Sequence, residues 1–169
     1  MRLTIDELSA MFPNAQQSVF RLETLQTYNV PTEQSKLERF LAGEKKPVEP
    51  ASEWRELIRR SVDAGQTWTK VKLVKRPLSD YQRFSLAWGV PANSRAGMEH
   101  RIIDITDRQL DLPGIDFWLF DDSTVVVIHY HEDGSPDWIE RIESDDVGQY
   151  RRWRDIALKE SVPFSEYRA

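Results

Sequence analysis

The stretch that decides the fold is Asp116–Asp133, which reads DFWLFDDSTVVVIHYHED. It is the most apolar and most β-prone run in the chain, and it is interrupted once, at 121–123, by small polar residues that favour a turn. Two strands joined by a tight turn form a hairpin, and a hairpin this apolar needs a larger sheet that other elements cover. We therefore expect the rest of the chain to be organised around this hairpin.

The segments on either side of the hairpin read as strands and helices. Strands are expected at 67–76, 100–105 and 138–142, helices after Ser52, after Ser79 and from about 146 to 161, and a loop at 89–97. The late strands are joined by turns too short for crossover connections, so a fully parallel sheet is not expected. The predicted fold is α+β, with a mainly antiparallel sheet covered on one face by helices.

The N-terminal part of the chain carries helix and strand signals and then a linker. Thr4-Ile5-Asp6-Glu7 matches a capping box, and residues 19–25 alternate as a strand or an extended arm does. A helix is expected over 32–42, and Glu44–Pro50, rich in proline and charge, is the best linker candidate. We expect an N-terminal helical arm at 1–43 and an α+β body at 51–169, within one continuous domain.

Length and composition bound the class of protein. A chain of 169 residues predicts one domain, and the lack of cysteine removes disulfides and thiolate chemistry and fits a reducing cytoplasm. There is no basic-then-apolar leader and no long apolar run, so we expect a cytoplasmic protein without a membrane span. The net charge of −5 combines a basic stretch, 55–83, with an acidic one, 104–146. This asymmetry indicates an association surface or charges that meet within the fold.

His129-Tyr130-His131 is the first candidate for chemistry. Alternation along a strand sends both histidines to one face, about 7 Å apart at Cα, which suits two ligands of one divalent metal. Glu132 or Asp133 could supply a third ligand. The same pattern arises where a strand leaves the core and ends in polar residues. A metal-assisted hydrolase or phosphodiesterase that uses His129 and His131 is therefore an alternative reading of the chain.

Two further groups of charged residues are weaker candidates. Carboxylates flank the aromatic strand, and one with a raised pKa beside Trp118 could act as a general acid, although acids at turns are common. Lys70, Lys72 and Arg76 on the strand at 67–76 could form a nucleic-acid surface. The sequence pI near 5.3 argues against a strong grip on phosphates, so direct nucleic-acid binding is only a second alternative.

Two blocks carry a family resemblance. Ser79-Asp80-Tyr81-Gln82-Arg83-Phe84 and Leu112–Asp121, reading LPGIDFWLFD, resemble an actinobacterial domain family of unknown function. The resemblance covers about 20–167 and implies a small cytoplasmic protein, often encoded beside WhiJ-type or XRE-type helix-turn-helix regulators. The order of elements is also similar to one half of a phospholipase D-type fold. That superfamily uses a His-x-Lys-x4-Asp motif, which is missing here because no lysine stands two residues after any histidine.

The favoured functional reading is a non-enzymatic regulatory or interaction protein that acts with a helix-turn-helix DNA-binding partner. No catalytic motif is present, and no cofactor is expected. Exposed aromatic side chains such as Trp68 and Trp118 would suit recognition of a protein surface. The residues expected to bind the partner are Asp80, Tyr81, Arg83, Asp116, Trp118 and Asp121.

Overall fold

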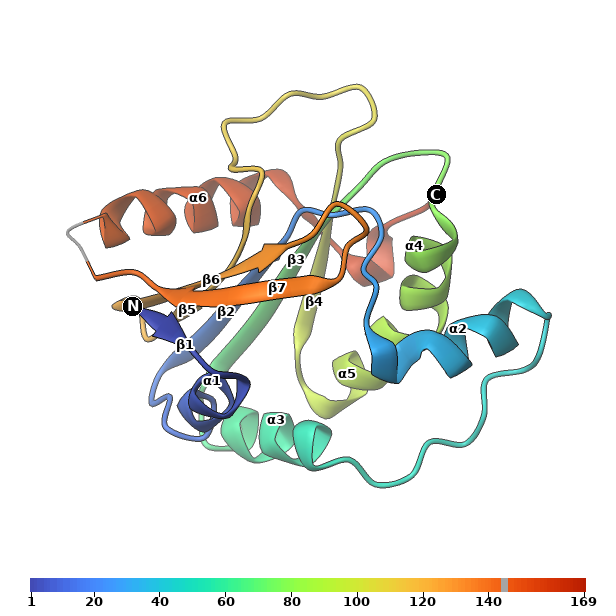
Figure 1. Cartoon of the computed structure of the whole chain (residues 1–169), viewed down its shortest axis with the longest axis horizontal. Helices are drawn as coiled ribbons and strands as arrows, with labels where there is room; N and C mark the ends of the chain where they lie inside the picture. The colour runs from blue at the N-terminus through green and yellow to red at the C-terminus, as the bar shows by residue number, and fades with distance from the viewer. Residues whose placement is uncertain (144–145) are drawn as a thin grey trace.

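The computed structural model describes residues 1–143 and 146–169, and in this part of the chain it contains an eight-stranded mixed sheet (Figure 1). In sheet order the strands are β1 (Arg2–Leu3), β7 (Pro136–Arg141), β6 (Thr124–Tyr130), β5 (Asp116–Phe120), β2 (Ser18–Glu23), β3 (Thr67–Val74), β4 (Glu99–Asp104) and β8 (Val162–Pro163). The helices are α1 (Ile5–Met11), α2 (Gln34–Leu41), α3 (Glu53–Asp63), α4 (Asp80–Phe84), α5 (Val90–Ala96) and α6 (Val147–Glu160). Short helical segments are η1 (Pro31–Glu33), η2 (Ser85–Gly89) and η3 (Phe164–Glu166).

Strand direction confirms the predicted fold class. The neighbours β2, β3 and β4 run parallel, and the remaining pairs in the sheet are antiparallel. Helix α3 lies between β2 and β3 in the sequence, and α4, η2 and α5 lie between β3 and β4. Helices supply the long crossovers that parallel neighbours need, whereas the antiparallel half is built from short turns.

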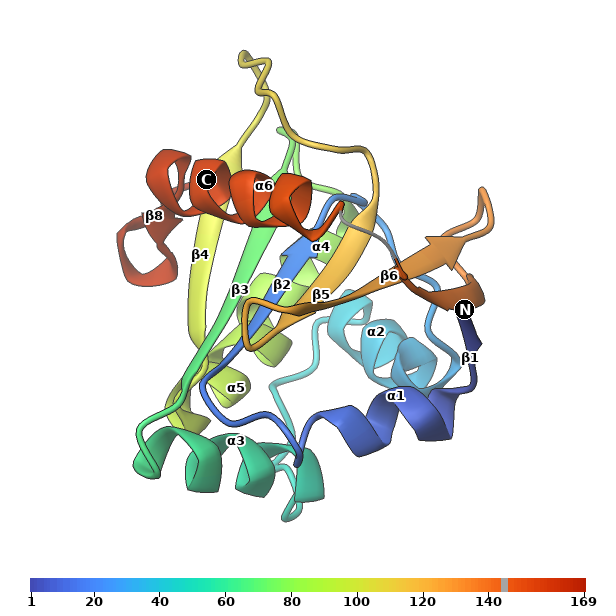
Figure 2. The ribbon, with the colours of Figure 1, turned by 90° about the vertical axis from the view of Figure 1, so that its left-hand side faces the viewer.

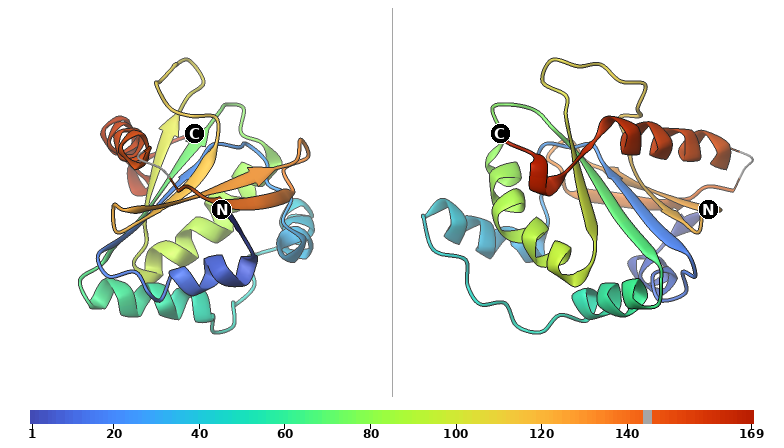
Figure 3. Two further views of the ribbon diagram at one scale, coloured as in Figure 1. Left: turned by 60° about the vertical axis from the view of Figure 1, so that its left-hand side comes forward. Right: turned by 180° about the vertical axis from the view of Figure 1, so that it is seen from behind.

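Helices cover both faces of the sheet, so the expectation that one face is covered was wrong. Helix α6 lies on one face, and α1, α3 and α5 lie on the other (Figures 2 and 3). The reason is visible in β5, where every residue from Asp116 to Phe120 is buried. Phe117 packs against Tyr150 of α6, while Trp118 packs against Phe12 on the opposite face. A strand that is apolar on both sides must be covered on both sides.

The predicted hairpin forms as expected, with β5 and β6 paired from Asp116 opposite Ile128 to Phe120 opposite Thr124. Asp121 and Asp122 occupy the turn with positive φ angles of 49° and 56°. Aspartate tolerates this conformation better than most residues because its short side chain can bond locally.

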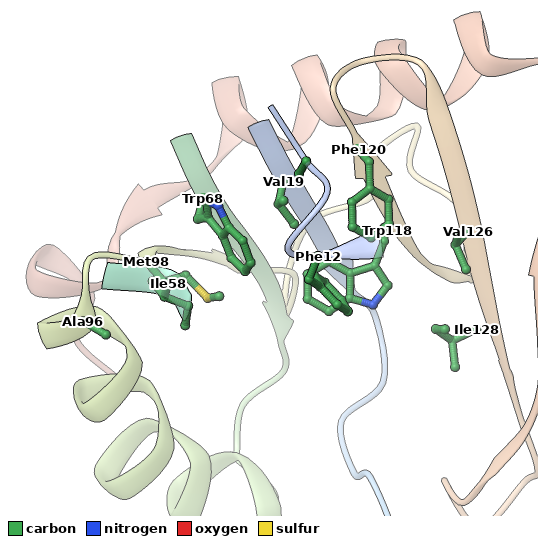
Figure 4. Close-up of a cluster of buried hydrophobic side chains, with 11 residues drawn as sticks. Phe12, Val19, Ile58, Trp68, Ala96, Met98, Trp118, Phe120, Val126 and Ile128 are labelled. Carbon is green, nitrogen blue, oxygen red and sulfur yellow. The ribbon is translucent and has the colours of Figure 1, made fainter. Parts of the chain in front are cut away.

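The core on the α1 side combines aromatic with aliphatic side chains (Figure 4). The ring of Phe12 lies 4.8 Å from that of Trp118 and 5.9 Å from that of Trp68, measured between centroids. Trp68 and Trp118 are 1% and 9% exposed, so the expectation that they are exposed for partner recognition was wrong. Both stand at inward positions of central strands, where packing decides their location.

Two further expectations need correction. Residues 89–97, expected as a loop, contain α5, because Pro91 fits the first turn of a helix and Gly97 ends it with a φ of 117°. The boundary between an arm at 1–43 and a body at 51–169 separates β2 from its neighbours, yet β2 lies between β5 and β3. The sheet therefore takes strands from both sides of the linker. No helix in the described ranges is long and apolar enough to cross a bilayer.

Candidate functional site

Alternation along three neighbouring strands places charged side chains on one face of the sheet. Val19 on β2 and Trp68 on β3 are paired in register and belong to the apolar core. Two residues further along each strand, Arg21 pairs with Lys70, and Lys70 pairs in turn with His100 of β4. Side chains two residues apart point to the same face. The aromatic core therefore passes directly into a row formed by an arginine, a lysine and a histidine.

This row borders a cavity of about 270 Å³, which we call the charged cavity. Its charged and phenolic lining comes from β2, β3, β4 and β6 and from the segments between strands: Arg21, Glu23, Tyr28, Glu33, Lys70, Lys72, Tyr81, His100 and Tyr130. The volume lies just below the usual range for small-molecule sites. A concave site with convergent polar groups is the strongest place in a fold to look for function.

Asp116 anchors the arginine of the row. It accepts hydrogen bonds from Nη2 of Arg21 at 3.0 Å and from the hydroxyl of Tyr28 at 2.7 Å. Its other oxygen accepts from the backbone N–H and the hydroxyl of Thr24, both at 2.8 Å. A buried carboxylate with this many donors holds its partners in fixed positions. Asp116 therefore orients Arg21 and Tyr28 toward the cavity.

Glu23 joins the two lysines of β3. Its Oε2 lies 2.6 Å from Nζ of Lys72, and its Oε1 lies 3.1 Å from Nζ of Lys70. Burial alone would raise the pKa of Glu23, but Lys70 and Lys72 outweigh it and hold the pKa well below its ordinary value. Burial lowers the pKa of Lys70. The cavity thus contains a lysine whose charged form is partly desolvated.

Arg21 keeps unused hydrogen-bonding capacity. Its side chain is 5% exposed, and Nη2 donates to Asp116 and to the hydroxyl of Tyr130. Nε and Nη1 are buried and have no hydrogen-bond partner among the described residues. The guanidinium carbon lies 5.1 Å from the centre of the Trp118 ring, which covers one side of the group. Buried donors without acceptors are costly, about 1–3 kcal/mol and more for charged groups, so this position favours an oxygen-rich ligand.

His100 supplies an uncharged imidazole at the end of the row. Its Nδ1 lies 3.0 Å from the hydroxyl of Ser94 on α5. Burial, with help from the Lys70 ammonium, lowers the pKa of His100 to about 3. The ring is therefore neutral at physiological pH and able to accept a proton when its surroundings change.

The lining of the charged cavity also contains Glu33 and phenolic hydroxyls. The hydroxyl of Tyr81, on α4, contacts the two carboxyl oxygens of Glu33 at 3.2 and 3.3 Å. Burial raises the pKa of Glu33, and it raises that of Tyr81 far more. At neutral pH Tyr81 is a hydrogen-bond donor, and Glu33 holds a proton more readily than an exposed glutamate does.

The structure brings some of the predicted site residues together and separates others. Tyr81, Lys70 and Lys72 border the charged cavity, and Asp116 holds its arginine. The two lysines face this interior space instead of the outer surface expected for nucleic-acid binding. Trp118 lies beneath Arg21.

The remaining binding candidates lie elsewhere. Asp80 and Arg83 form an exposed ion pair on α4, and Arg76 pairs with Asp104 at 2.6 Å. Asp121 accepts from the backbone N–H groups of 16–18 at 2.7 to 3.1 Å, which fixes the entry of the chain into β2. These contacts explain why the four residues are placed where they are, without a ligand.

His129 and His131 contact different carboxylates. Nε2 of His129 lies 3.0 Å from Oε2 of Glu140, and its ring stacks on Trp138 at 3.9 Å. Nε2 of His131 lies 3.6 Å from Oδ1 of Asp137. Across 1–143 and 146–169, no group of three or more histidine, aspartate or glutamate side chains is placed to hold a metal ion.

Sequence reasoning missed Arg21, Glu23, Glu33 and His100 as members of one site. The signal for the first two was present, because the alternation Val19-Arg21-Glu23 puts charges on the same face as a buried valine. A charged pair at inward positions of an apolar strand indicates a buried polar site. Glu33 gave no such signal, since it comes to the cavity only through the folding of η1.

The chain is similar to known proteins in its fold and in its sequence. A phospholipase D family member, Nuc from Salmonella typhimurium, is similar with a TM-score of 0.51 and 9% identity, over 97% of this chain and 90% of that chain. NucT from Helicobacter pylori gives a TM-score of 0.48 and 9% identity, over 94% of this chain and 89% of that chain. No curated protein matches the chain. A family model described as a domain of unknown function, DUF6879, matches residues 6–169.

The likeness to Nuc shows a shared fold, and it corrects the functional expectation. A non-enzymatic regulatory protein acting with a helix-turn-helix partner was favoured mainly because members of the resembled family are often encoded beside such regulators, and also because no catalytic motif appears in the sequence. The shared fold with a phospholipase D family member speaks against that expectation. The order of elements along the chain already resembled one half of a phospholipase D-type fold, but sequence motifs could not reveal the charged cavity, because its polar residues come from separate strands.

Proposed function

The chain belongs to the family described as a domain of unknown function, DUF6879, and we propose that it is a phosphodiesterase that acts in the charged cavity. The observation that carries the proposal is the row of Arg21, Lys70 and His100, in register on β2, β3 and β4 and bordering one cavity. The shared fold with a phospholipase D family member adds support. The sequence-based alternative placed the chemistry at His129 and His131, whereas this proposal places it at His100.

Phosphate binding falls to Arg21 and Lys70. Nε and Nη1 of Arg21 are buried donors that need an acceptor, and phosphate oxygens suit a guanidinium well. Lys70 adds a desolvated positive charge beside them. Asp116 and Trp118 keep the guanidinium in place, so its donors are oriented before the ligand arrives.

His100 acts as the general base that takes a proton from the attacking water. Its low pKa arises first from burial and then from the neighbouring Lys70 ammonium. A phosphate anion in the cavity offsets that positive charge and raises the pKa of the imidazole. Substrate binding thus moves His100 toward the range in which a base is effective. In the tautomer that carries its proton on Nδ1, His100 donates to the hydroxyl of Ser94, and the lone pair of Nε2 serves as the base.

Hydrolysis of bis(p-nitrophenyl) phosphate tests the proposal, with His100→Asn as the variant and His129→Asn as the matched control. Loss of the base is expected to lower kcat by about 10²–10⁴-fold, while the control, whose ring stacks on Trp138 outside the cavity, keeps its rate. The reverse pattern would return the chemistry to His129 and His131. Absence of hydrolysis by the wild type would overturn the proposed function.

A further inference from the structure

Glu33 differs from the other carboxylates at the charged cavity. Glu23 is paired with Lys70 and Lys72, and Asp116 with Arg21. The Glu33 side chain has no ion pair among the described residues. Its two carboxyl oxygens accept from the hydroxyl of Tyr81. A carboxyl group without a cationic partner is the one that a proton occupies first.

From this position we infer that Glu33 is the proton donor to the leaving oxygen, an inference that rests on the proposed phosphodiesterase function. It is half-buried on η1, it accepts from the hydroxyl of Tyr81, and it borders the same cavity as His100. The surroundings shift the pKa values of Glu33 and His100 in opposite directions, upward for the acid and downward for the base, and hydrolysis requires such a pair of groups. Tyr81, by donating to the carboxyl, fixes the direction in which Glu33 points.

In the proposed reaction His100 accepts one proton and Glu33 donates one. The water oxygen attacks phosphorus while one water proton passes to His100. The bond between phosphorus and the leaving oxygen breaks, and the Glu33 carboxyl gives its proton to that oxygen, which leaves as an alcohol. The products are a phosphomonoester and an alcohol, and a proton returns from His100 to Glu33 through solvent.

The charges facing Glu33 support its protonated form. Burial raises its pKa and Glu23 on β2 adds to that rise, whereas Tyr81 on α4 and Lys70 and Lys72 on β3 lower it. The two lysines are already engaged by Glu23. A bound phosphate adds negative charge beside Glu33 and favours its proton further.

The test compares methyl phenyl phosphate with methyl p-nitrophenyl phosphate, two monoanions that differ in the leaving group. Phenolate is the poorer leaving group and depends on a proton donor, whereas p-nitrophenolate leaves without one. Glu33→Gln keeps an oxygen for Tyr81 but loses the proton. It should lower the rate on the phenyl ester by about 100-fold and on the p-nitrophenyl ester by less than about threefold. Glu38→Gln, on the exposed side of α2, is the matched control and should change neither rate.

The outcomes separate the two proposals. Wild type that hydrolyses neither ester overturns the phosphodiesterase and Glu33 together. An equal loss on both esters, or no loss, in Glu33→Gln overturns the role of Glu33 alone. Carbon-13 NMR of the Glu33 carboxyl gives a second measurement, assigned with the Gln variant. A titration midpoint above the ordinary value of 4.5 supports the role, and one at or below it overturns it.

Discussion

Arg21 and Asp116 form a buried ion pair between β2 and β5, with Nη2 and Oδ2 at 3.0 Å and side chains 5% and 0% exposed. The pair connects the centre of the sheet to the charged cavity, because Asp116 also accepts from Tyr28 and Thr24. A charge removed from water in this way is stable only while its partner remains.

Asp116→Asn should therefore lower the free energy of unfolding by about 3–5 kcal/mol, since it removes the close counter-charge of the buried Arg21 guanidinium. Only Glu23 remains, with its Oε1 at 3.8 Å from Nε of Arg21, and Lys70 and Lys72 already engage that carboxylate. Urea denaturation at pH 7 measures the change. Asp80→Asn is the control, because Asp80 pairs with Arg83 in an exposed position and should cost no more than about 1 kcal/mol. Equal effects of the two substitutions would contradict the prediction.

His100 predicts a specific dependence of stability on pH. Its pKa falls from the ordinary 6.5 to about 3 in the folded protein, so the unfolded chain binds the proton first as the pH drops. The stabilisation by the neutral ring is complete above pH 6.5 and is lost progressively down to about pH 3. Relative to His100→Asn, wild type should lose about 2 kcal/mol between pH 7 and pH 4.5. Urea denaturation of both proteins checks this, and parallel pH profiles would count against it.

The sequence predicts the antiparallel half of the sheet well because the signals there are local. The hairpin of β5 and β6 is specified by two apolar runs and three turn residues, 121–123, and the structure follows that pattern. The pairing of the parallel strands is harder to predict from the sequence. The neighbours β2 and β3 are separated by more than forty residues of linker and helix, so no local sequence pattern predicts that they pair. Tertiary packing decides that contact.

The candidate site was harder to predict than the fold for the same reason. Lys70 and Lys72 look like an exposed basic face in sequence, since alternation cannot say which side of a strand is covered. Helices on both faces turn that basic face inward, where Glu23 neutralises it. The charge asymmetry of the chain is thus resolved in part inside the fold.

Phe12 packs the end of α1 against the core, and its removal should lower the stability of the protein. Its ring lies 5.0 Å from Trp54, 4.8 Å from Trp118 and 5.2 Å from Phe120, measured between centroids. Phe12→Ala should destabilise the protein by about 3–5 kcal/mol through lost burial and the cavity left behind. Val48→Ala, at a side chain that is 99% exposed, should change stability by less than about 0.5 kcal/mol. Thermal or urea unfolding distinguishes them, and a Phe12 variant as stable as wild type would refute this role.

Gly134 and Gly43 offer a matched pair of glycines. Their φ angles are +81° and +79°, so an alanine at either position meets the same backbone strain, about 1 kcal/mol. The surroundings differ. A Cβ on Gly134 would lie 2.4 Å from the backbone oxygen of Thr27, whereas one on Gly43 would meet nothing within 4 Å.

Gly134→Ala should therefore destabilise the protein by at least about 2 kcal/mol more than Gly43→Ala, because backbone must move to relieve the clash.

The effect of Gly134→Ala should also reach the charged cavity. The Gly134 carbonyl accepts from the N–H of Asn29, next to Tyr28, whose hydroxyl binds Asp116. Displacing this loop shifts Tyr28 and loosens Arg21, so the alanine at 134 should lower phosphodiester hydrolysis while the one at 43 leaves it unchanged. Urea denaturation and the hydrolysis assay measure the two effects, and equal destabilisation by both alanines would show that the contact with Thr27 is not limiting.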